Sequence, residues 1–157
     1  MDQLLQYLEA NEWLVPVTVI VSLGFCVILE AFIPLSRGRD HKIEHYGINT
    51  VFLLSTVFVS APLIALHGLV FIWQAKSEVG LLYTLDLPIW MGLLLSILVL
   101  DLIGQYVIHF MLHRVKWLWR FHMVHHSDTR VDATTGFRHH PGDAICRNLA
   151  TLFAVII

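Results

Sequence analysis

Three apolar segments, each long enough to cross a lipid bilayer, constrain the fold of this chain more than any other feature. A membrane-spanning helix needs about 20 apolar residues, and the segments cover residues 14–35, 51–73 and 87–108. A fourth apolar segment covers 144–157. Each segment must be helical, because an open strand in lipid leaves backbone polar groups unpaired. The sequence therefore predicts an all-α integral membrane protein with three complete transmembrane helices and the start of a fourth.

The composition agrees with a membrane protein and excludes other classes. Hydrophobic residues make up 57% of the 157 residues and charged residues 14%, against about 25% charged residues in soluble domains. A net charge of -2 provides no basic surface for nucleic acid. Cys26 and Cys146 are too widely separated to indicate a disulfide framework or a thiolate zinc site. We expect one membrane-embedded domain over residues 1–157, in which residues 1–13 form an interfacial helix.

Positively charged residues are distributed unequally between the two sides of the predicted membrane. The loop near 36–46 and the stretch 114–147 together hold nine Lys and Arg residues, whereas residues 1–13 and the loop near 74–86 hold one. Loops rich in Lys and Arg stay in the cytoplasm. The sequence therefore predicts a multi-pass protein whose N-terminus lies outside and whose 109–143 segment is cytoplasmic.

Seven of the ten histidines lie between residues 109 and 140, in a pattern typical of metal ligands. The spacing in HFMLH (i, i+4) and in HMVHH (i, i+3, i+4) places the histidines of each motif on one face of a helix. Two such helices facing each other would direct five neutral imidazoles, which bind iron, zinc and copper, into one volume. The alternative is a solvated or pH-sensing cluster. The five residues are His109, His113, His122, His125 and His126.

Other residues near these motifs bear on the chemistry. HFMLH lacks the glutamate that HExxH metalloproteases use as a general base, which disfavours a zinc protease. Asp101 falls on the same helix face as His109, and we expect its carboxylate to orient a ligand imidazole; the alternative is a polar residue satisfied by a neighbouring helix. His41 and His45 are expected at the surface, and His67 packed or hydrogen-bonded within the second span.

The order of these motifs resembles the fatty acid hydroxylase and sterol desaturase superfamily of integral membrane di-iron enzymes. The similar segment runs from Asp101 through HxxxH and WRFHxxHHSD to RxHPxD, which ends at Asp143. Glu30, Pro34 and Asn49 are also similar to the N-terminal half of the family. The ordered combination over about forty residues is far more specific than a single HxxxH.

The resemblance assigns roles to further residues. It implies that His140 is a sixth metal ligand and ranks His139 behind it. It also implies that Arg138 and Asp128 join Asp101 in orienting the ligands by hydrogen bonding. No catalytic residue is expected apart from the metal ligands.

The resemblance also implies a reaction and its cofactors. Members of the superfamily use two irons and O2 to oxidise a C–H bond in a lipid, by hydroxylation or desaturation of a fatty acid, sterol or ether lipid. The chain has no GxGxxG fingerprint for a nucleotide, so electrons would come from a separate reductase, ferredoxin or cytochrome. The DATTGFRHHP run is most similar to bacterial members, which implies the bacterial inner membrane rather than the endoplasmic reticulum.

The superfamily has one more HxxHH cluster downstream of the motifs found here. We therefore expect residues 1–157 to be the N-terminal part of a longer enzyme. The alternative is a catalytically incomplete metal-binding membrane protein or pseudo-enzyme, and iron content and O2 consumption with a lipid distinguish the two. Arg114, Lys116, Arg120 and Arg130 are expected either to dock an acidic electron donor or to contact anionic lipid headgroups.

Overall fold

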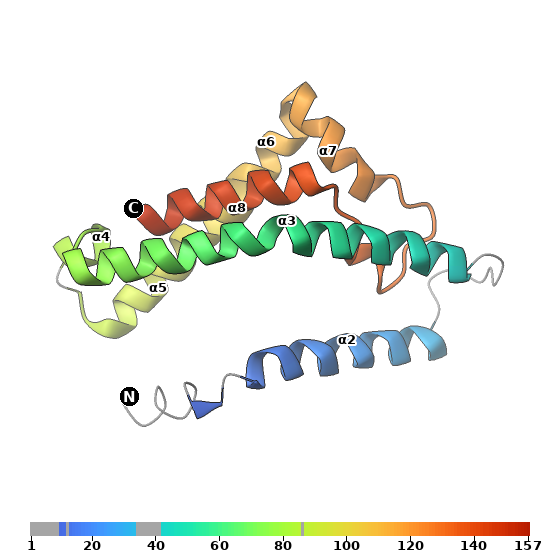
Figure 1. Cartoon of the computed structure of the whole chain (residues 1–157), viewed down its shortest axis with the longest axis horizontal. Coiled ribbons are helices and arrows are strands. Elements are labelled where there is room, and N and C mark those ends of the chain that lie inside the picture. Colours follow the sequence, from blue (N-terminus) through green and yellow to red (C-terminus); the bar gives the residue numbers. More distant parts are fainter. Residues whose placement is uncertain (1–9, 12, 34–41, 86) are drawn as a thin grey trace.

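The computed structural model describes residues 10–11, 13–33, 42–85 and 87–157, and every regular element in these ranges is a helix (Figure 1). In chain order the elements are α2 (Leu14–Phe32), α3 (Lys42–Ser77), α4 (Leu81–Thr84), α5 (Ile89–Asp101), the π-helix η1 (Leu102–Val107), α6 (Ile108–Arg114), α7 (Lys116–His126), the 3₁₀ turn η2 (Thr135–Phe137) and α8 (Pro141–Ile156). The all-α prediction is confirmed. The interfacial helix expected over residues 1–13 falls mostly outside the described residues.

Two helical segments are long and apolar enough to cross a membrane. One covers Ile43–Thr84 and the other Ile89–Arg114. Only 6% and 11% of their most apolar windows are buried, so these apolar side chains cover the outside of the molecule rather than a core. Such a surface is typical of contact with lipid. The first expected span corresponds to α2, whose described apolar stretch, Val17–Phe32, is shorter than the other two.

The helix α3 is longer than the sequence predicts. The expected span of 51–73 lies inside a continuous helix of 36 residues that passes through Pro62. Because α3 begins at Lys42, residues expected as a loop form more than two additional turns. These turns carry Asn49, whose Nδ2 donates to Thr134 Oγ1 at 2.8 Å. The additional turns therefore bring α3 against the loop that precedes α8.

The third expected span continues directly into the first histidine motif. Its elements α5, η1 and α6 form one rod, in which π-helical turns replace α-helical ones over residues 102–107. A π-helix has more residues per turn than an α-helix. Gly104 lies in η1 against α8, where a Cβ would come within 2.9 Å of Thr151 Oγ1 and 3.4 Å of Thr151 Cα. The absence of a side chain at this position allows the two helices to approach closely.

The two histidine motifs are joined by a sharp turn. Val115 has an extended conformation (φ −93°, ψ 115°) between α6 and α7, and the two helices fold back on each other at the apex of the molecule in Figure 1. Ile108, Leu112 and Leu118 are buried together where this hairpin packs. The chain then crosses to α3 and returns as α8, which packs against both α3 and η1.

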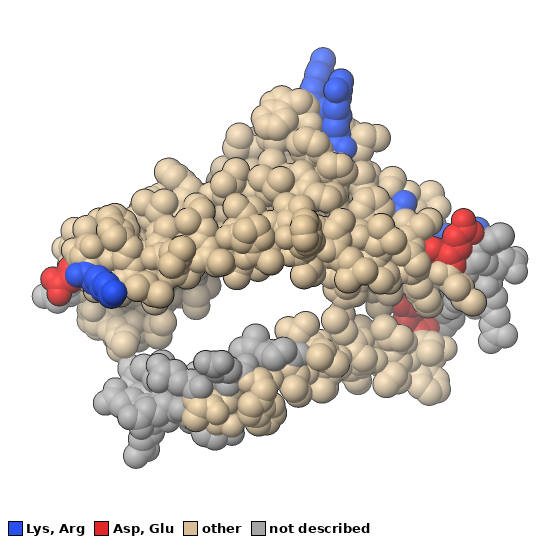
Figure 2. Space-filling model, in the orientation of Figure 1, with Lys and Arg blue, Asp and Glu red and all other residues tan. Residues whose placement is uncertain are grey.

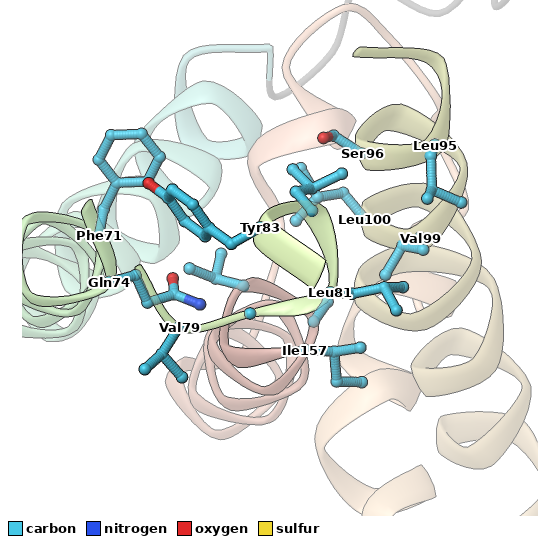
Figure 3. A pocket seen from close by; sticks show the side chains of 14 residues that line it. Phe71, Gln74, Val79, Leu81, Tyr83, Leu95, Ser96, Val99, Leu100 and Ile157 are labelled. Atoms are coloured by element: carbon cyan, nitrogen blue, oxygen red, sulfur yellow. The ribbon is translucent and has the colours of Figure 1, made fainter. Parts of the chain in front are cut away.

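The C-terminal end of α8 meets the far end of α3. The Leu81 amide donates to the Ile157 carbonyl at 2.5 Å, and Gln74 Nε2 donates to the Ile156 carbonyl at 3.3 Å. A cavity of about 350 Å³ lies at this end, lined mainly by apolar side chains of α3, α4, α5 and α8 (Figure 3). The cavity and the histidine motifs are therefore at opposite ends of α8.

The close contact between η1 and α8 predicts the effect of a small substitution. Gly104→Ala should lower the free energy of unfolding by about 1–3 kcal/mol, because its methyl group would be forced against Thr151. Thr151→Ala in the same chain should restore part of this loss by removing Oγ1. Thermal unfolding in detergent measures both effects. Gly68→Ala is the control, since a Cβ there meets nothing within 4 Å. Equal melting temperatures for Gly104→Ala and Gly68→Ala would contradict the prediction.

Candidate metal centre

The two histidine motifs meet across the α6–α7 hairpin. His109 and His113 project from α6 and His122 from α7, and one ring nitrogen of each lies within 4.8 Å of the others. The Nε2 atoms of His109 and His113 are 3.2 Å apart. Metal–nitrogen bonds of about 2.0–2.1 Å place neighbouring ligand atoms about 3 Å apart. These three imidazoles are thus close enough to ligate one ion.

Two more histidines of α7 extend the cluster. His126 Nε2 is 3.1 Å from His122 Nε2, and its ring centroid lies 4.9 Å from that of His113. His125 stacks on His139, with centroids 4.6 Å apart and ring planes at 5°. The Nδ1 of His125 is buried and has no hydrogen-bond partner in the part of the chain that the structure describes. The five imidazoles predicted from the sequence are therefore neighbours in the folded chain.

A buried carboxylate from α8 supports the cluster. Asp143 is fully buried, and its Oδ2 accepts hydrogen bonds from His122 Nδ1 at 2.8 Å and His139 Nδ1 at 3.3 Å. Arg147 Nε donates to its Oδ1 at 2.8 Å. Burial opposes ionisation, but these three donors outweigh it and hold the pKa of Asp143 well below its usual range. Because an ionised carboxylate only accepts, the His122 proton is on Nδ1 and its Nε2 is left free for a metal.

The Arg147 side chain also reaches α6. Its Nη2 donates to His109 Nδ1 at 2.9 Å, and its Nη1 donates to Gln105 Oε1 at 3.4 Å. Asp143 and Arg147 are one turn apart on α8, and together they contact histidines of both helices of the hairpin. The sequence interpretation had no role for Arg147 beyond membrane orientation, although an Asp–Arg pair at i, i+4 after the histidine motifs marks this face of α8.

Burial also sets the protonation of the α7 histidines. It lowers the pKa of His122, although the hydrogen bond and charge of Asp143 act in the opposite direction. Burial, reinforced by the neighbouring His139, lowers the pKa of His125 to about 4. Both imidazoles are therefore neutral near pH 7, which is the form that ligates a metal.

The three residues expected to orient the ligands lie elsewhere. Asp101 is exposed at the end of α5, and its carboxylate has no hydrogen bond to any described residue. The π-helical turns of η1 separate it from His109, so the α-helical spacing that related the two does not apply. Asp128 Oδ2 accepts a hydrogen bond from Thr135 Oγ1 of η2 at 2.6 Å. Arg138 Nε donates to the Val124 carbonyl at 3.3 Å. Among the described residues, both organise the loop after α7 and neither bonds to an imidazole of the cluster.

A second polar cluster joins this loop to the N-terminal helices. His45, expected at the surface, has only 13% of its side chain exposed and lies 3.5 Å from Asp128 and 3.1 Å from Asp132. Asn49 is fully buried beside it. From α2, Glu30 Oε2 accepts a hydrogen bond from the loop backbone at 2.7 Å. Nothing in the local sequence marks His45, because its partners lie far away along the chain.

The two histidines that precede α8 have different partners. His140 caps the helix, since its Nδ1 accepts a hydrogen bond from the Gly142 amide at 2.9 Å. Its ring stacks on Phe121, with centroids 5.0 Å apart and planes at 17°. His139 lies against the cluster through the stacked pair and the carboxylate described above.

Two other histidines lie away from the cluster or outside the described ranges. The ring nitrogens of His67 are 2.6 Å from the Leu63 carbonyl and 3.0 Å from the Asn148 carbonyl. His67 is thus hydrogen-bonded within the second predicted span, which confirms the expectation. His41 lies outside the described residues.

The donor set fits a metal ion that prefers nitrogen ligands, such as iron or zinc. Imidazole nitrogens from two helices converge, and a carboxylate orients one of them from behind. The buried Nδ1 of His125 has no partner in the described chain, and such atoms in native proteins call for a missing ion, water or ligand. His109, His113 and His122, with His126 beside them, could hold one ion.

These observations define an all-helical protein with membrane-length apolar helices and a carboxylate-supported histidine centre. Residues 93–157, which contain both histidine motifs and Asp143, match the family model described as fatty acid hydroxylase. The match confirms the resemblance to the fatty acid hydroxylase and sterol desaturase superfamily over these residues. The family consists in general of lipid-modifying membrane oxidoreductases. No curated protein and no solved structure has a significant match to the chain.

The contacts of Asp143 predict how strongly the centre depends on it. Asp143→Asn should weaken Co(II) binding by about 10–100-fold, because a neutral amide no longer fixes the His122 proton or balances Arg147. Titration of the purified protein followed by cobalt absorption measures this change. Asp101→Asn is the matched control and should bind like the unmodified protein. Weaker binding in the Asp101 variant alone would instead support the role that the sequence predicts for Asp101.

Proposed function

We propose that this chain contains the catalytic centre of a membrane lipid oxygenase. Such an enzyme would use two irons and O2 to hydroxylate or desaturate a C–H bond of a fatty acid, sterol or ether lipid. The observation that carries the proposal is the convergence of His109, His113 and His122 at one end of membrane-length helices, with Asp143 behind them. A lipid substrate partitions into the bilayer, so a centre at the ends of the spans meets it without extracting it into water.

Iron held by these histidines would supply, with O2, the oxidising power that an unactivated C–H bond requires. Hydroxylation consumes one O2, two electrons and two protons, and it yields an alcohol and water. His109, His113, His122 and His126 are the nitrogen ligands of the proposed centre. Asp143 keeps the His122 proton on Nδ1, which leaves the Nε2 lone pair for the metal.

The chain also contributes a dry environment behind the ligands. Ile108, Leu112 and Leu118 are buried together inside the hairpin that carries the histidines. Water is thereby kept from one side of the cluster, and hydrogen bonds such as those of Asp143 are stronger in such surroundings. Arg147, bonded to Asp143 and His109, joins α8 to α6, and the hydrogen bond between Asp143 and His122 joins α8 to α7.

We propose that the chain crosses the bilayer with three complete spans and that α8 begins the fourth, all within one domain. In support, α8 runs beside α3 from the histidine end to α4, where Leu81 and Ile157 are hydrogen-bonded. The excess of Lys and Arg at the histidine end favours an N-terminus outside and histidines in the cytoplasm. The bacterial inner membrane is the proposed location.

We propose that a separate acidic reductase, ferredoxin or cytochrome supplies the electrons at the α6–α7 turn. Arg114, Lys116 and Arg120 belong to this turn, and Figure 2 shows Lys and Arg side chains projecting from the apex of the molecule. A positive surface beside a redox centre attracts a negatively charged partner and orients it. The short distance along the hairpin to His113 and His122 makes this surface suitable for electron entry.

Removal of one ligand tests the enzymatic function. His122→Ala should lower O2-dependent oxidation of membrane lipid by at least about 100-fold, because loss of a ligand exceeds the 10–100-fold effect of residues behind ligands. Mass spectrometry of lipids from membranes that contain the native protein, supplied with reductant and O2, measures the product. His67→Gln is the control, as His67 bonds to backbone carbonyls in α3 and α8. An unmodified protein that holds zinc and oxidises no lipid would support the pseudo-enzyme alternative instead.

A single pair of variants tests the orientation and the donor surface. In a chain whose native cysteines are replaced by serine, Lys116→Cys should react with an anionic, membrane-impermeant thiol reagent only from the cytoplasmic side. Lys76→Cys lies at the C-terminal end of α3, away from the histidine motifs, and should react only from outside. Modification of the Lys116 variant should slow reduction by the electron donor several-fold at low salt, since the substitution removes a positive charge and the reagent then adds a negative one. Modification of the Lys76 variant should not; the reverse pattern of labelling would contradict the proposed orientation.

A further inference from the structure

We propose that Trp119 is a positioning residue of the histidine centre. Its indole ring packs on the imidazoles of His113 and His126 and holds both in the orientation that binding of a metal requires. The proposal rests on the metal-dependent function described above and adds to it a residue that is not itself a ligand. Three observations carry it: the ring contacts of Trp119, the exposure of the two histidines that it contacts, and the different surroundings of Trp117.

The Trp119 ring lies against three imidazoles of the cluster. Its centroid is 5.3 Å from that of His113, 5.6 Å from that of His126 and 6.1 Å from that of His122. Aromatic rings attract each other at centroid separations of about 4.5–7 Å. Because His113 belongs to α6 and the other two histidines belong to α7, the indole connects the two histidine motifs.

The local structure explains why the indole reaches both helices. Trp119 precedes His122 by three residues and His126 by seven, so the three side chains share one face of α7. The Trp119 amide donates to the Val115 carbonyl at 2.9 Å, which fixes the backbone of Trp119 in the first turn of α7. The sharp turn at Val115 then brings His113 of α6 against the same face.

The two histidines nearest the indole have little other support. His122 is fully buried and donates to Asp143. In contrast, His113 and His126 are exposed. Within the described ranges, each of their imidazoles is hydrogen-bonded only to another imidazole of the cluster. Packing against Trp119 therefore restricts two rings that would otherwise be free to rotate, and a ligand that is fixed beforehand binds a metal more tightly.

Trp117 shows how a tryptophan of the same helix is placed when it lies away from the cluster. Its side chain is 60% exposed, and its ring meets Phe121 edge-on, with centroids 6.3 Å apart. Tryptophans that anchor a helix at the membrane surface face lipid and headgroups in this way. Trp119 is less exposed and is directed toward the imidazoles instead. Membrane anchoring alone therefore does not account for its position.

The test compares matched variants of the native protein in lipid nanodiscs. Trp119→Leu keeps an apolar side chain but removes the aromatic ring, whereas Trp119→Phe keeps a ring. Trp117→Leu is the control, because it removes an indole from the same helix away from the cluster. Co(II) is the probe, and its binding is followed by visible absorption and by tryptophan fluorescence, which a bound Co(II) ion quenches in nearby indoles. Circular dichroism establishes whether each variant retains its helices.

We expect Trp119→Leu to weaken Co(II) binding by about 10-fold, the lower end of the range for residues that support metal ligands. Trp119→Phe should recover most of the affinity, and Trp117→Leu should bind like the unmodified protein. At saturating Co(II), both Trp119 variants should lose more of the quenching than Trp117→Leu does, because the indole nearest the imidazoles is absent. If Trp119→Leu loses its helices, the affinity and quenching of Trp119→Phe decide the proposal.

Two results would overturn the proposal. One is unchanged Co(II) affinity in a folded Trp119→Leu variant, which would leave Trp119 as a membrane anchor. The other is equal weakening in Trp119→Leu and Trp117→Leu, which would show a general effect on α7. Quenching that depends more on Trp117 than on Trp119 would also contradict the proposal. Absence of Co(II) binding by the unmodified protein would instead contradict the metal-dependent function itself.

Discussion

The histidine centre depends on one interaction, the bond between the buried carboxylate of Asp143 and the guanidinium of Arg147. A fully buried carboxylate is stable only when its oxygens and its charge are compensated, and here Arg147, His122 and His139 provide this. The same pair orients both helices of the hairpin, since the carboxylate holds His122 of α7 and the guanidinium holds His109 of α6. Without Arg147 the buried charge of Asp143 would lose its positive partner, and without Asp143 the imidazoles of His122 and His139 would lose their common acceptor.

The position of α8 makes this interaction available. Its close approach to η1 needs the missing side chain of Gly104 opposite Thr151, and its start is held by the cap and ring contacts of His140. The loop before α8 is fixed in turn from α3, where Asn49 and His45 contact it. Polar contacts at the histidine end therefore locate the centre. The apolar spans provide the rigid helices on which it is built.

Much of this arrangement follows from helical periodicity. Apolar runs predict α3 and the α5–α6 rod, and the spacing of HxxxH and HxxHH predicts five imidazoles in one region. The same reasoning fails at Asp101, because η1 is π-helical and its residue types do not indicate that the number of residues per turn changes there. It also places the start of α3 too late, since polar residues before residue 51 hide a helix that is stabilised by contacts with a distant loop. Local spacing is reliable only while the helix stays regular.

The sequence by itself determined the helical class, the segments apolar enough to enter a membrane and the histidines that share a helix face. These properties depend on residues within one or two helical turns of each other, which the order of residues states directly. Only the tertiary structure decided that Asp143 and Arg147 support the imidazoles, that His45 is drawn inward, and that His139 lies against the cluster while His140 caps α8. These outcomes depend on contacts between helices far apart in the chain, and the packing of α8 against η1 and α3 fixes them.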